Sequence, residues 1–255
     1  MNWHVRSLLF LCAAAFLDVQ AVMAQGMLRV YGPGGPYEAM REAASEFSRA
    51  AGVQVEVIAG PTPKWLAQAK DDADLVYSGA EFMMTDLTAA MAGAIDEATV
   101  TPLYLRPAAI LVRPGNPKRI QDFPDLLRPG MNVLVVQGAG QTGLWEDIAG
   151  KQGDIRTVRA LRNNIRAVMP NSADAKKRWG EDSSLDAWLT WDTWQRANPA
   201  TADLVPIGER YVIYRDCGIA LTKQGKTKKL AQQFVEFLLS PEGARVFAKW
   251  GWIAP

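Results

Sequence analysis

Short apolar segments alternate with amphipathic helical segments along the chain, and this alternation constrains the fold more than any other feature. Residues 133–136 form an apolar run of the length of a buried strand, and residues 28–31 form a similar run that is apolar except for Arg29. Met40, Ala44 and Phe47 recur between such runs at helical spacing. Repeated strand–loop–helix units indicate mostly parallel sheets flanked by helices, so the sequence predicts an α/β fold.

The N-terminal segment has the layout of a secretory signal peptide. His4 and Arg6 precede an apolar run over residues 8–17, and small side chains lead to Ala24. Asp18 interrupts the run well before the ~20 residues that a membrane-spanning helix needs. We therefore predict cleavage after Ala24 and export of a soluble protein to the periplasm.

Composition then excludes several classes of function. Cleavage removes His4, the only histidine, and Cys12, so that Cys217 is the one remaining cysteine. Histidine-based acid–base and nucleophilic catalysis are excluded, and a conventional zinc site is disfavoured. The formal net charge of +1 offers no basic excess for nucleic acid or an anionic membrane. We expect no cofactor, no metal and no enzymatic activity.

Two places in the chain favour a division into lobes. A Pro-rich stretch at residues 102–107 precedes a second set of strand–loop–helix units, and the chain returns near residues 208–211. A strand over residues 211–221 and two helices, over about 226–239 and from Pro241, complete the chain. Roughly 230 residues after cleavage suit one large domain or two lobes.

Glycine, proline or small hydroxyl residues stand between a strand and the following helix at several positions. These loops lie at residues 32–36, 60–63, 78–79, 138–143 and 170–172. They supply hydroxyl donors from Thr62, Ser78, Thr142 and Ser172 and amide donors from Gln141 and Asn171. Helix N-termini bind anions through unpaired N–H groups, and such loops gather at the carboxyl ends of parallel strands. Any one of them is equally explained as helix capping, but together they predict an anion site.

One loop also matches a weak nucleotide-binding pattern. Gly138, Gly140 and Gly143 give G-x-G-x-x-G, which in a dinucleotide site precedes a second strand ending in an acidic residue. Residues 151–162 have the pattern of a basic helix instead, and the sequence contains no G-x-x-x-x-G-K-[ST] phosphate loop. We therefore expect neither dinucleotide binding nor ATP hydrolysis by this chain.

Aromatic side chains are a further source of candidate contacts. Trp188, Trp191 and Trp194 lie close together in the sequence. Tryptophans line ligand pockets in some proteins, but more often they pack a core or hinge. Trp191 ends a predicted strand on the cleft side, so it is the one of the three that we expect to contact ligand.

Arginines on the predicted crossing strands are candidate anion-binding groups. Arg215 follows Tyr214 in a strand that should cross between the lobes. A cleft arginine would bind a carboxylate or oxyanion with two parallel hydrogen bonds, whereas the structural alternative is an ion pair with Asp216 or another acid. Arg106 and Arg113 have the same two interpretations at the other crossing.

Several segments together resemble a known family. FVEFLLSPEGARVFAKWGW at residues 234–252 and ILVRPGNPKRIQDFPDLL at residues 110–127 resemble type II periplasmic solute-binding proteins. More specific segments are YGPGGPYEAM, GPTPKW, DLVYSGAEFMMTD, VVQGAGQTGLWED, DAWLTW and YRDCGIALTK. These resemble the accessory colonization factor AcfC group, which is itself similar to sulfate- and molybdate-binding proteins. The resemblance covers almost the whole chain after the signal segment.

The resemblance implies two α/β lobes, a hinge of two crossing strands and a cleft that closes on a small ligand. It places lobe I at residues 25–105 with 211–255, and lobe II at residues 106–210. It implies ligand contacts from Gly34, Gly35, Thr62, Gly140, Gln141, Thr142, Asn171 and Ser172. The first loop carries Gly and Pro where oxyanion binders often have serine, so a carboxylate ligand held by Arg215 stays open.

We therefore expect a monomeric solute-binding protein that captures a sulfate-like oxyanion or small carboxylate for the permease of an ABC transporter. The alternatives are a sensor that presents the bound ligand to a chemoreceptor and, less favoured, an exported enzyme on the same fold. The full set of expected ligand residues is Gly34, Gly35, Thr62, Ser78, Gly140, Gln141, Thr142, Asn171, Ser172, Trp191, Tyr214 and Arg215.

Overall fold

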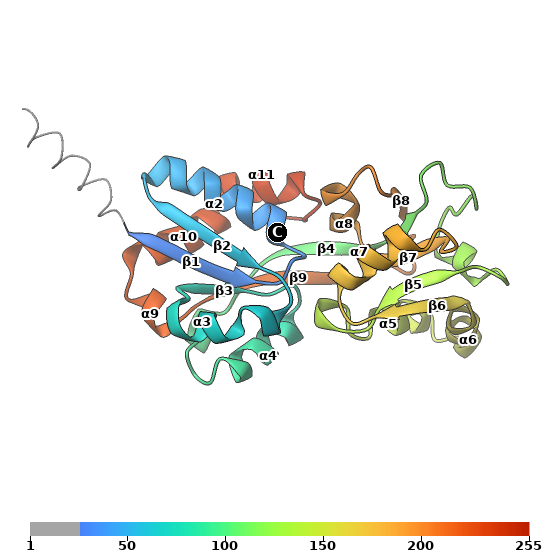
Figure 1. Ribbon diagram of the computed structural model, residues 1–255, viewed down its shortest axis with the longest axis horizontal. Helices are drawn as coiled ribbons and strands as arrows, with labels where there is room; N and C mark the ends of the chain where they lie inside the picture. The colour runs from blue at the N-terminus through green and yellow to red at the C-terminus, as the bar shows by residue number, and fades with distance from the viewer. Residues whose placement is uncertain (1–25, 255) are drawn as a thin grey trace, which may run out of the picture.

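Two long neighbouring strands join the two halves of the molecule, as Figure 1 shows for the computed structural model, which describes residues 26–254. These strands are β4 (Thr101–Val112) and β9 (Tyr214–Leu221). β4 pairs antiparallel with β9 through its first half and with β7 and β8 through its second half. The predicted signal segment at residues 1–24 lies outside the described residues.

Lobe I contains three parallel strands, to which β9 adds an antiparallel neighbour. Its strands are β1 (Met27–Gly32), β2 (Gln54–Ala59) and β3 (Leu75–Tyr77). Its helices are α2 (Tyr37–Ala51), η1 (Thr62–Lys64), α3 (Leu66–Asp72), α4 (Glu81–Ala90), η2 (Glu97–Thr99), α9 (Lys223–Lys226), α10 (Lys229–Leu239) and α11 (Pro241–Lys249). Helix α2 ends at Gly52, whose φ of 66° lies in the left-handed region that glycine adopts readily.

Lobe II repeats the arrangement with three parallel strands beside the second half of β4. Its strands are β5 (Val133–Val136), β6 (Ile165–Met169), β7 (Ala187–Trp191) and β8 (Asp203–Pro206). Its helices are η3 (Phe123–Leu127), η4 (Ala139–Gln141), α5 (Leu144–Gly150), α6 (Ile155–Asn164), α7 (Ser172–Glu181) and α8 (Asp192–Ala197). The strands of both lobes follow the order β2-β1-β3-β9-β4-β7-β5-β6, with β8 beside β4.

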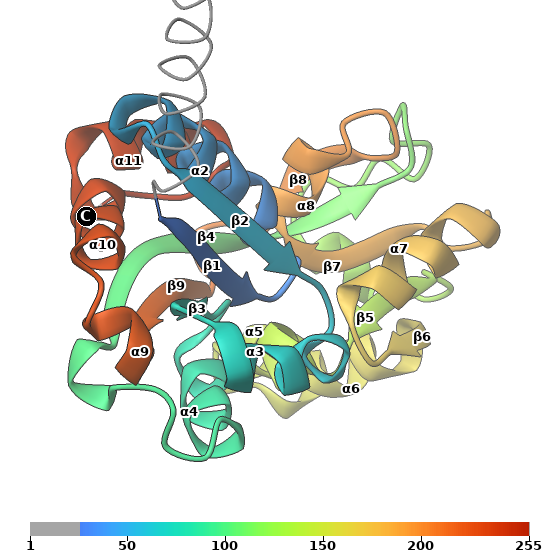
Figure 2. The same ribbon diagram turned by 60° about the vertical axis from the view of Figure 1, so that its left-hand side comes forward.

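Each lobe has its own hydrophobic core on both faces of its sheet. In lobe I, one cluster includes Met40 and Phe247 and the other includes Trp65 and Met84. In lobe II, the two clusters use residues between 108 and 213. Helices therefore cover both faces of each half, which Figure 2 shows from a second direction. The predicted two-lobed α/β architecture is confirmed.

The sequence did not predict the extent of β4. Residues 102–107 read as a Pro-rich boundary, yet they lie inside this strand and pair with β9. A shift of register between Pro102 and Tyr104 accommodates the break in the ladder, which is where strands tolerate proline. The predicted lobe limits at 105/106 and 210/211 stay a prediction. In the described part of the chain, no helix is long and apolar enough to cross a membrane.

Candidate functional site

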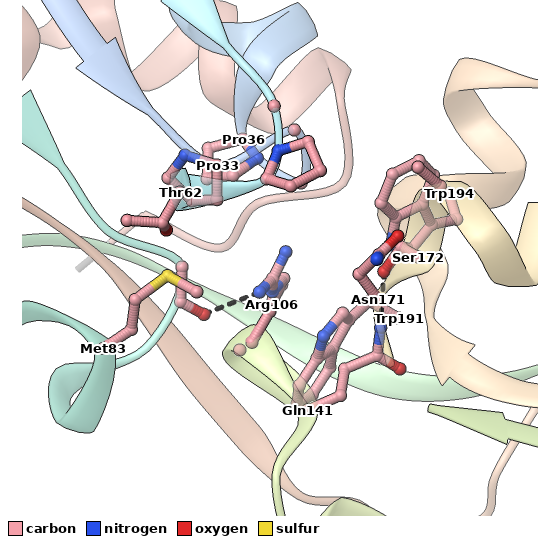
Figure 3. Close-up of a pocket in the computed structure, with 18 residues that line it drawn as sticks. Pro33, Pro36, Thr62, Met83, Arg106, Gln141, Asn171, Ser172, Trp191 and Trp194 are labelled. Carbon is pink, nitrogen blue, oxygen red and sulfur yellow. Dashed lines mark hydrogen bonds between the residues drawn. The ribbon is translucent and has the colours of Figure 1, made fainter. Parts of the chain in front are cut away.

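A pocket lies between the lobes, where the ends of the parallel strands face one another (Figure 3). Its empty space is about 580 Å³, including the solvent at its mouth. Lobe I lines it with Pro33, Gly34, Gly35, Pro36, Gly60, Pro61, Thr62, Gly79 and Met83. Lobe II and the hinge strand line it with Arg106, Ala139, Gly140, Gln141, Asn171, Ser172, Ala173, Trp191 and Trp194.

Arg106 on β4 is the only charged side chain among these lining residues. Its side chain is 2% exposed, and its Nη2 donates a hydrogen bond to the Gly79 carbonyl oxygen at 2.6 Å. Its guanidinium carbon lies 4.7 Å from the Trp191 ring centroid and 4.9 Å from that of Trp252. Burial lowers the pKa of Arg106 to about 10, so the guanidinium remains charged at neutral pH.

Protein groups of the described chain satisfy the Arg106 guanidinium only in part. Within residues 26–254, its Nε and Nη1 have no hydrogen-bond partner and no carboxylate forms an ion pair with it. A buried charge without a partner costs several kcal/mol, in the range of about 3–5 kcal/mol when one member of a buried pair is removed. An anion in this pocket would supply the missing opposite charge and an acceptor for a free N–H group of Arg106.

Glycines surround the Arg106 guanidinium because larger residues would collide with it. A Cβ added to Gly35 would lie 2.6 Å from its Nη1, and one added to Gly79 would lie 3.0 Å from its Nη2. A Cβ on Gly140 would lie 3.0 Å from the Gly79 carbonyl oxygen and 3.3 Å from Nη2. The glycines that the sequence suggested for approach to ligand therefore also make room for the arginine.

A chain of hydrogen bonds in lobe II determines whether the Ser172 hydroxyl donates or accepts in the pocket. The Thr190 hydroxyl donates to Gln141 Oε1 at 2.9 Å. Gln141 Nε2 in turn donates to Ser172 Oγ at 2.7 Å, as Figure 3 shows. Thr190 and Gln141 are buried at 0% and 3% exposure. Since Ser172 Oγ already accepts a hydrogen bond, its O–H is free to donate into the pocket.

The other polar groups of the pocket either are hydrogen-bond donors or are bonded to neighbouring protein groups. The Nε1 atoms of Trp191 and Trp194 are buried and have no partner among the described residues. Asn171 caps helix α7 by accepting from the Asp174 backbone N–H at 2.9 Å, while its Nδ2 donates to the Asp174 carboxylate. Among the described residues, no aspartate or glutamate lines the pocket. The arrangement is therefore suited to a ligand rich in acceptor oxygens.

Two carboxylates lie in the surroundings of Arg106. Asp192 accepts from Arg196 Nε at 3.3 Å, and burial raises the pKa of this carboxyl. Oδ1 of Asp192 and Oδ2 of Asp216 are buried without a partner in the described chain. Both contribute to the electrostatic field at Arg106 without pairing with it.

The pocket brings together eight of the residues predicted to bind ligand. They are Gly34, Gly35, Thr62, Gly140, Gln141, Asn171, Ser172 and Trp191. Their contact with a ligand stays a prediction. The shared location follows from the topology, because β1, β2, β5 and β6 all end at this side of their sheets.

The other four predicted residues do not line this pocket. Ser78 is fully buried, and its Oγ accepts from the Gly218 backbone N–H at 3.3 Å. The Thr142 hydroxyl donates to the Ala139 carbonyl oxygen, and Tyr214 is 45% exposed. Arg215 pairs with Asp147, the structural alternative that the sequence had left open.

The sequence left open whether Arg106 binds an anion or forms an ion pair. In the structure Arg106, and not Arg215, lines the pocket between the lobes. One signal could have identified it. Arg106 is the only charged residue between Thr101 and Val112, a segment otherwise made of apolar, hydroxyl and proline residues. A charge within a long apolar strand of a two-lobed protein points to the cleft, because elsewhere its burial would be costly.

Comparisons with known proteins show which family the chain resembles over its length. Bacterial extracellular solute-binding proteins match residues 28–253. The chain is 27% identical to the sulfate-binding protein of Escherichia coli over 168 residues, 57% of this chain and 50% of that protein. It is 29% identical over 151 residues to the molybdate-binding protein ModA of Mycobacterium tuberculosis, 57% of this chain and 53% of that protein. The match thus spans about half the length of these relatives.

Solved structures extend the similarity over most of the chain. PEB3 in its L-phospholactate-bound crystal structure is 35% identical, with a TM-score of 0.84 over 89% of this chain and 100% of that chain. PEB3 is a Campylobacter jejuni protein. The sulfate-binding protein SubI of Mycobacterium tuberculosis, 20% identical, shares the fold with a TM-score of 0.74 over 89% of this chain and 86% of that chain. The predicted resemblance to sulfate- and molybdate-binding proteins is confirmed, and this chain belongs to the family of bacterial extracellular solute-binding proteins.

Proposed function

We propose that this protein captures a small oxyanion in the pocket between its lobes, with Arg106 as the main charged contact. The observation that carries the proposal is the buried guanidinium, whose Nε and Nη1 lack partners in the described chain. The surrounding donors include the Ser172 hydroxyl and the Trp191 indole N–H, and no carboxylate lines the site. Donors around one cation suit a dianion and disfavour a cation or a neutral apolar solute.

The ligand that best suits the pocket, and that agrees with the ligands named for the relatives, is a small phosphorylated or sulfate-like acid. Two relatives are named for binding sulfate and molybdate, and PEB3 was crystallised with L-phospholactate, which carries a phosphate and a carboxylate. A compound of this kind joins the two ligand classes expected from the sequence, the oxyanion and the small carboxylate. In this proposal Arg106 takes the anion-binding role that the sequence reading gave to Arg215.

Capture would occur by closure of the lobes about the hinge strands β4 and β9. Both lobes supply donors to the same pocket, so bound anion bridges them and favours the closed arrangement. We propose that the protein is exported to the periplasm and delivers its ligand to the permease of an ABC transporter. The narrower likeness to the AcfC group stays a prediction. The chemoreceptor alternative also stays a prediction, and it requires the same capture of the ligand as transport does.

A thermal-shift screen tests the proposal. The purified protein would be scanned with sulfate, molybdate, phosphate, L-phospholactate and lactate. A ligand at 100 times its dissociation constant adds about 2.7 kcal/mol to the free energy of unfolding. We expect a clear shift with at least one tetrahedral oxyanion or phosphate ester and none with lactate. Absence of any shift with the oxyanions and L-phospholactate would contradict the proposed function.

A further inference from the structure

A second pocket adjoins the anion site. Gly34, Gly35 and Trp194 line both pockets, so the two spaces share a wall. The second pocket continues between the start of α2 in lobe I and helix α8 in lobe II. Its other walls include Tyr37, Glu38, Lys176, Thr193, Trp250 and Trp252.

The chemistry of this second pocket differs from that of the first. Arg106 does not line it, and its charged members are one acid, Glu38, and one base, Lys176. Glu38 is already held by Arg41 at 2.8 Å on the same helix. Four aromatic side chains, one tyrosine and three tryptophans, are among its twelve lining residues. A space with balanced charge and aromatic walls suits a neutral group better than a second anionic head.

A buried hydroxyl indicates that this neutral group is polar. Thr193 is 5% exposed, lines the second pocket, and its Oγ1 has no hydrogen-bond partner among residues 26–254. The Trp194 Nε1 at the shared wall is likewise buried without a partner. Buried polar groups are nearly always hydrogen-bonded, so both atoms call for a ligand with hydroxyl groups.

From these observations we infer that the natural ligand is an organic oxyanion ester whose hydroxylated, uncharged tail occupies the second pocket while its anionic head lies at Arg106. The inference rests on the proposed function and narrows it to a phosphorylated or sulfated polyol or sugar. Such a tail would place C–H faces against the aromatic walls and a hydroxyl within reach of Thr193. Because residues of both lobes line this pocket, the tail would also contribute to closure.

A calorimetric titration with matched ligands distinguishes the contributions of the two pockets to binding affinity. Methyl phosphate supplies the anionic head without a tail, whereas glycerol 3-phosphate and glucose 6-phosphate add hydroxylated tails of increasing size. We expect at least one of the two tailed esters to bind at least about tenfold more tightly than methyl phosphate, the gain of a well-filled small subsite. If neither ester binds more tightly than methyl phosphate, the inference is overturned.

Substitutions at the second pocket give the matching control. Ala197 lines this pocket but not the first, so Ala197→Phe fills it. The expected result is loss of the tail-dependent gain with unchanged affinity for methyl phosphate, and Thr193→Val should remove part of the same gain. The control Ala200→Phe, at an exposed position outside both pockets, should keep the gain.

The outcomes distinguish the inference from the proposed function. Binding of methyl phosphate together with a tail gain that survives Ala197→Phe would overturn the inference alone. Failure of every phosphate ester and of sulfate, molybdate and phosphate to bind would contradict the proposed function, and the inference with it.

Discussion

The guanidinium of Arg106 lies over the ring of Trp191, 4.7 Å from its centroid, at the junction of the two lobes. Arg106 comes from the hinge strand β4 and Trp191 from the end of β7, and the two strands pair with each other beyond this point. The ring covers one face of the cation, while Nε and Nη1 remain without partners in the described chain. An aromatic face attracts the cation without neutralising it, so the charge stays available to an anion.

Gly35 should be required for binding because its hydrogen makes room for this guanidinium. A Cβ at Gly35 would lie 2.6 Å from Arg106 Nη1, so Gly35→Ala must displace the arginine head. We expect about a tenfold or greater loss of affinity for the tightest ligand of the screen, equivalent to at least ~1.4 kcal/mol. The measurement is calorimetric titration. Gly180→Ala, where an added Cβ meets nothing within 4 Å, is the matched substitution and should bind normally.

Thr190 should act on ligand affinity through Gln141 and Ser172. In Thr190→Val, Gln141 Oε1 loses its donor at 2.9 Å, and the amide can turn to accept from Ser172 instead. The Ser172 O–H then no longer points to the ligand, so affinity should fall about 2- to 12-fold, the value of one hydrogen bond. Thr227→Val, at an exposed position in lobe I, is the control for loss of a hydroxyl. Equal affinities for all three proteins would contradict this role of Thr190.

Asp192 should make the protein less stable as pH rises. Burial raises the pKa of this carboxyl above its ordinary value of 3.8, so the folded protein binds the proton more tightly than the unfolded chain. Stability therefore falls as pH increases from 3.8 through the raised pKa, and the loss persists above it. Asp192→Asn carries no ionisable group, so its stability relative to the wild type should increase as the pH rises from about 4 to 7.

Thermal unfolding of both proteins between about pH 4 and pH 7 measures this effect. An advantage of Asp192→Asn that grows as pH falls would contradict the assigned direction of the shift.

The regular parts of the fold were predictable because their patterns are local. Residues 133–136 form an uninterrupted apolar run, and β5 occupies the same four positions with every side chain buried. The full length of β4 was not predictable, because Pro102 and Pro107 are read locally as strand breakers. Pairing with β9 and a shift of register beside Pro102 let the strand continue, and neither is visible in the segment itself.

The sequence could not predict which of two arginines, Arg106 or Arg215, is free to bind an anion in the pocket. Arg106 and Arg215 are directly opposite each other in the antiparallel pair β4–β9, so strand alternation gives both the same orientation. Only Asp147, 68 positions before Arg215, decides which of them is neutralised. A contact between residues so far apart in the chain leaves no periodic signal, whereas the glycine-rich loops that line the pocket were recognisable locally.

Arg106 should contribute to ligand binding but add little to the stability of the ligand-free protein. Replacing an unpaired buried charge by an apolar side chain of similar length is often neutral or stabilising. Arg106→Met should therefore unfold within a few degrees of the wild type or above it when no ligand is present, because ~1 kcal/mol corresponds to about 2–4 °C at this size. A large loss of thermal stability would instead assign Arg106 a structural role.

The central claim is tested most directly by calorimetric titration of the wild type, Arg106→Met and Arg215→Met with L-phospholactate and sulfate. Removing the charged partner of a buried anion costs about 2–5 kcal/mol, so Arg106→Met should lose roughly 30- to 5,000-fold in affinity for whichever anion the wild type binds. Arg215→Met, which loses only the pair with Asp147 outside the pocket, should stay within about twofold. Normal binding by Arg106→Met, or a selective loss in Arg215→Met, would contradict the account of this pocket.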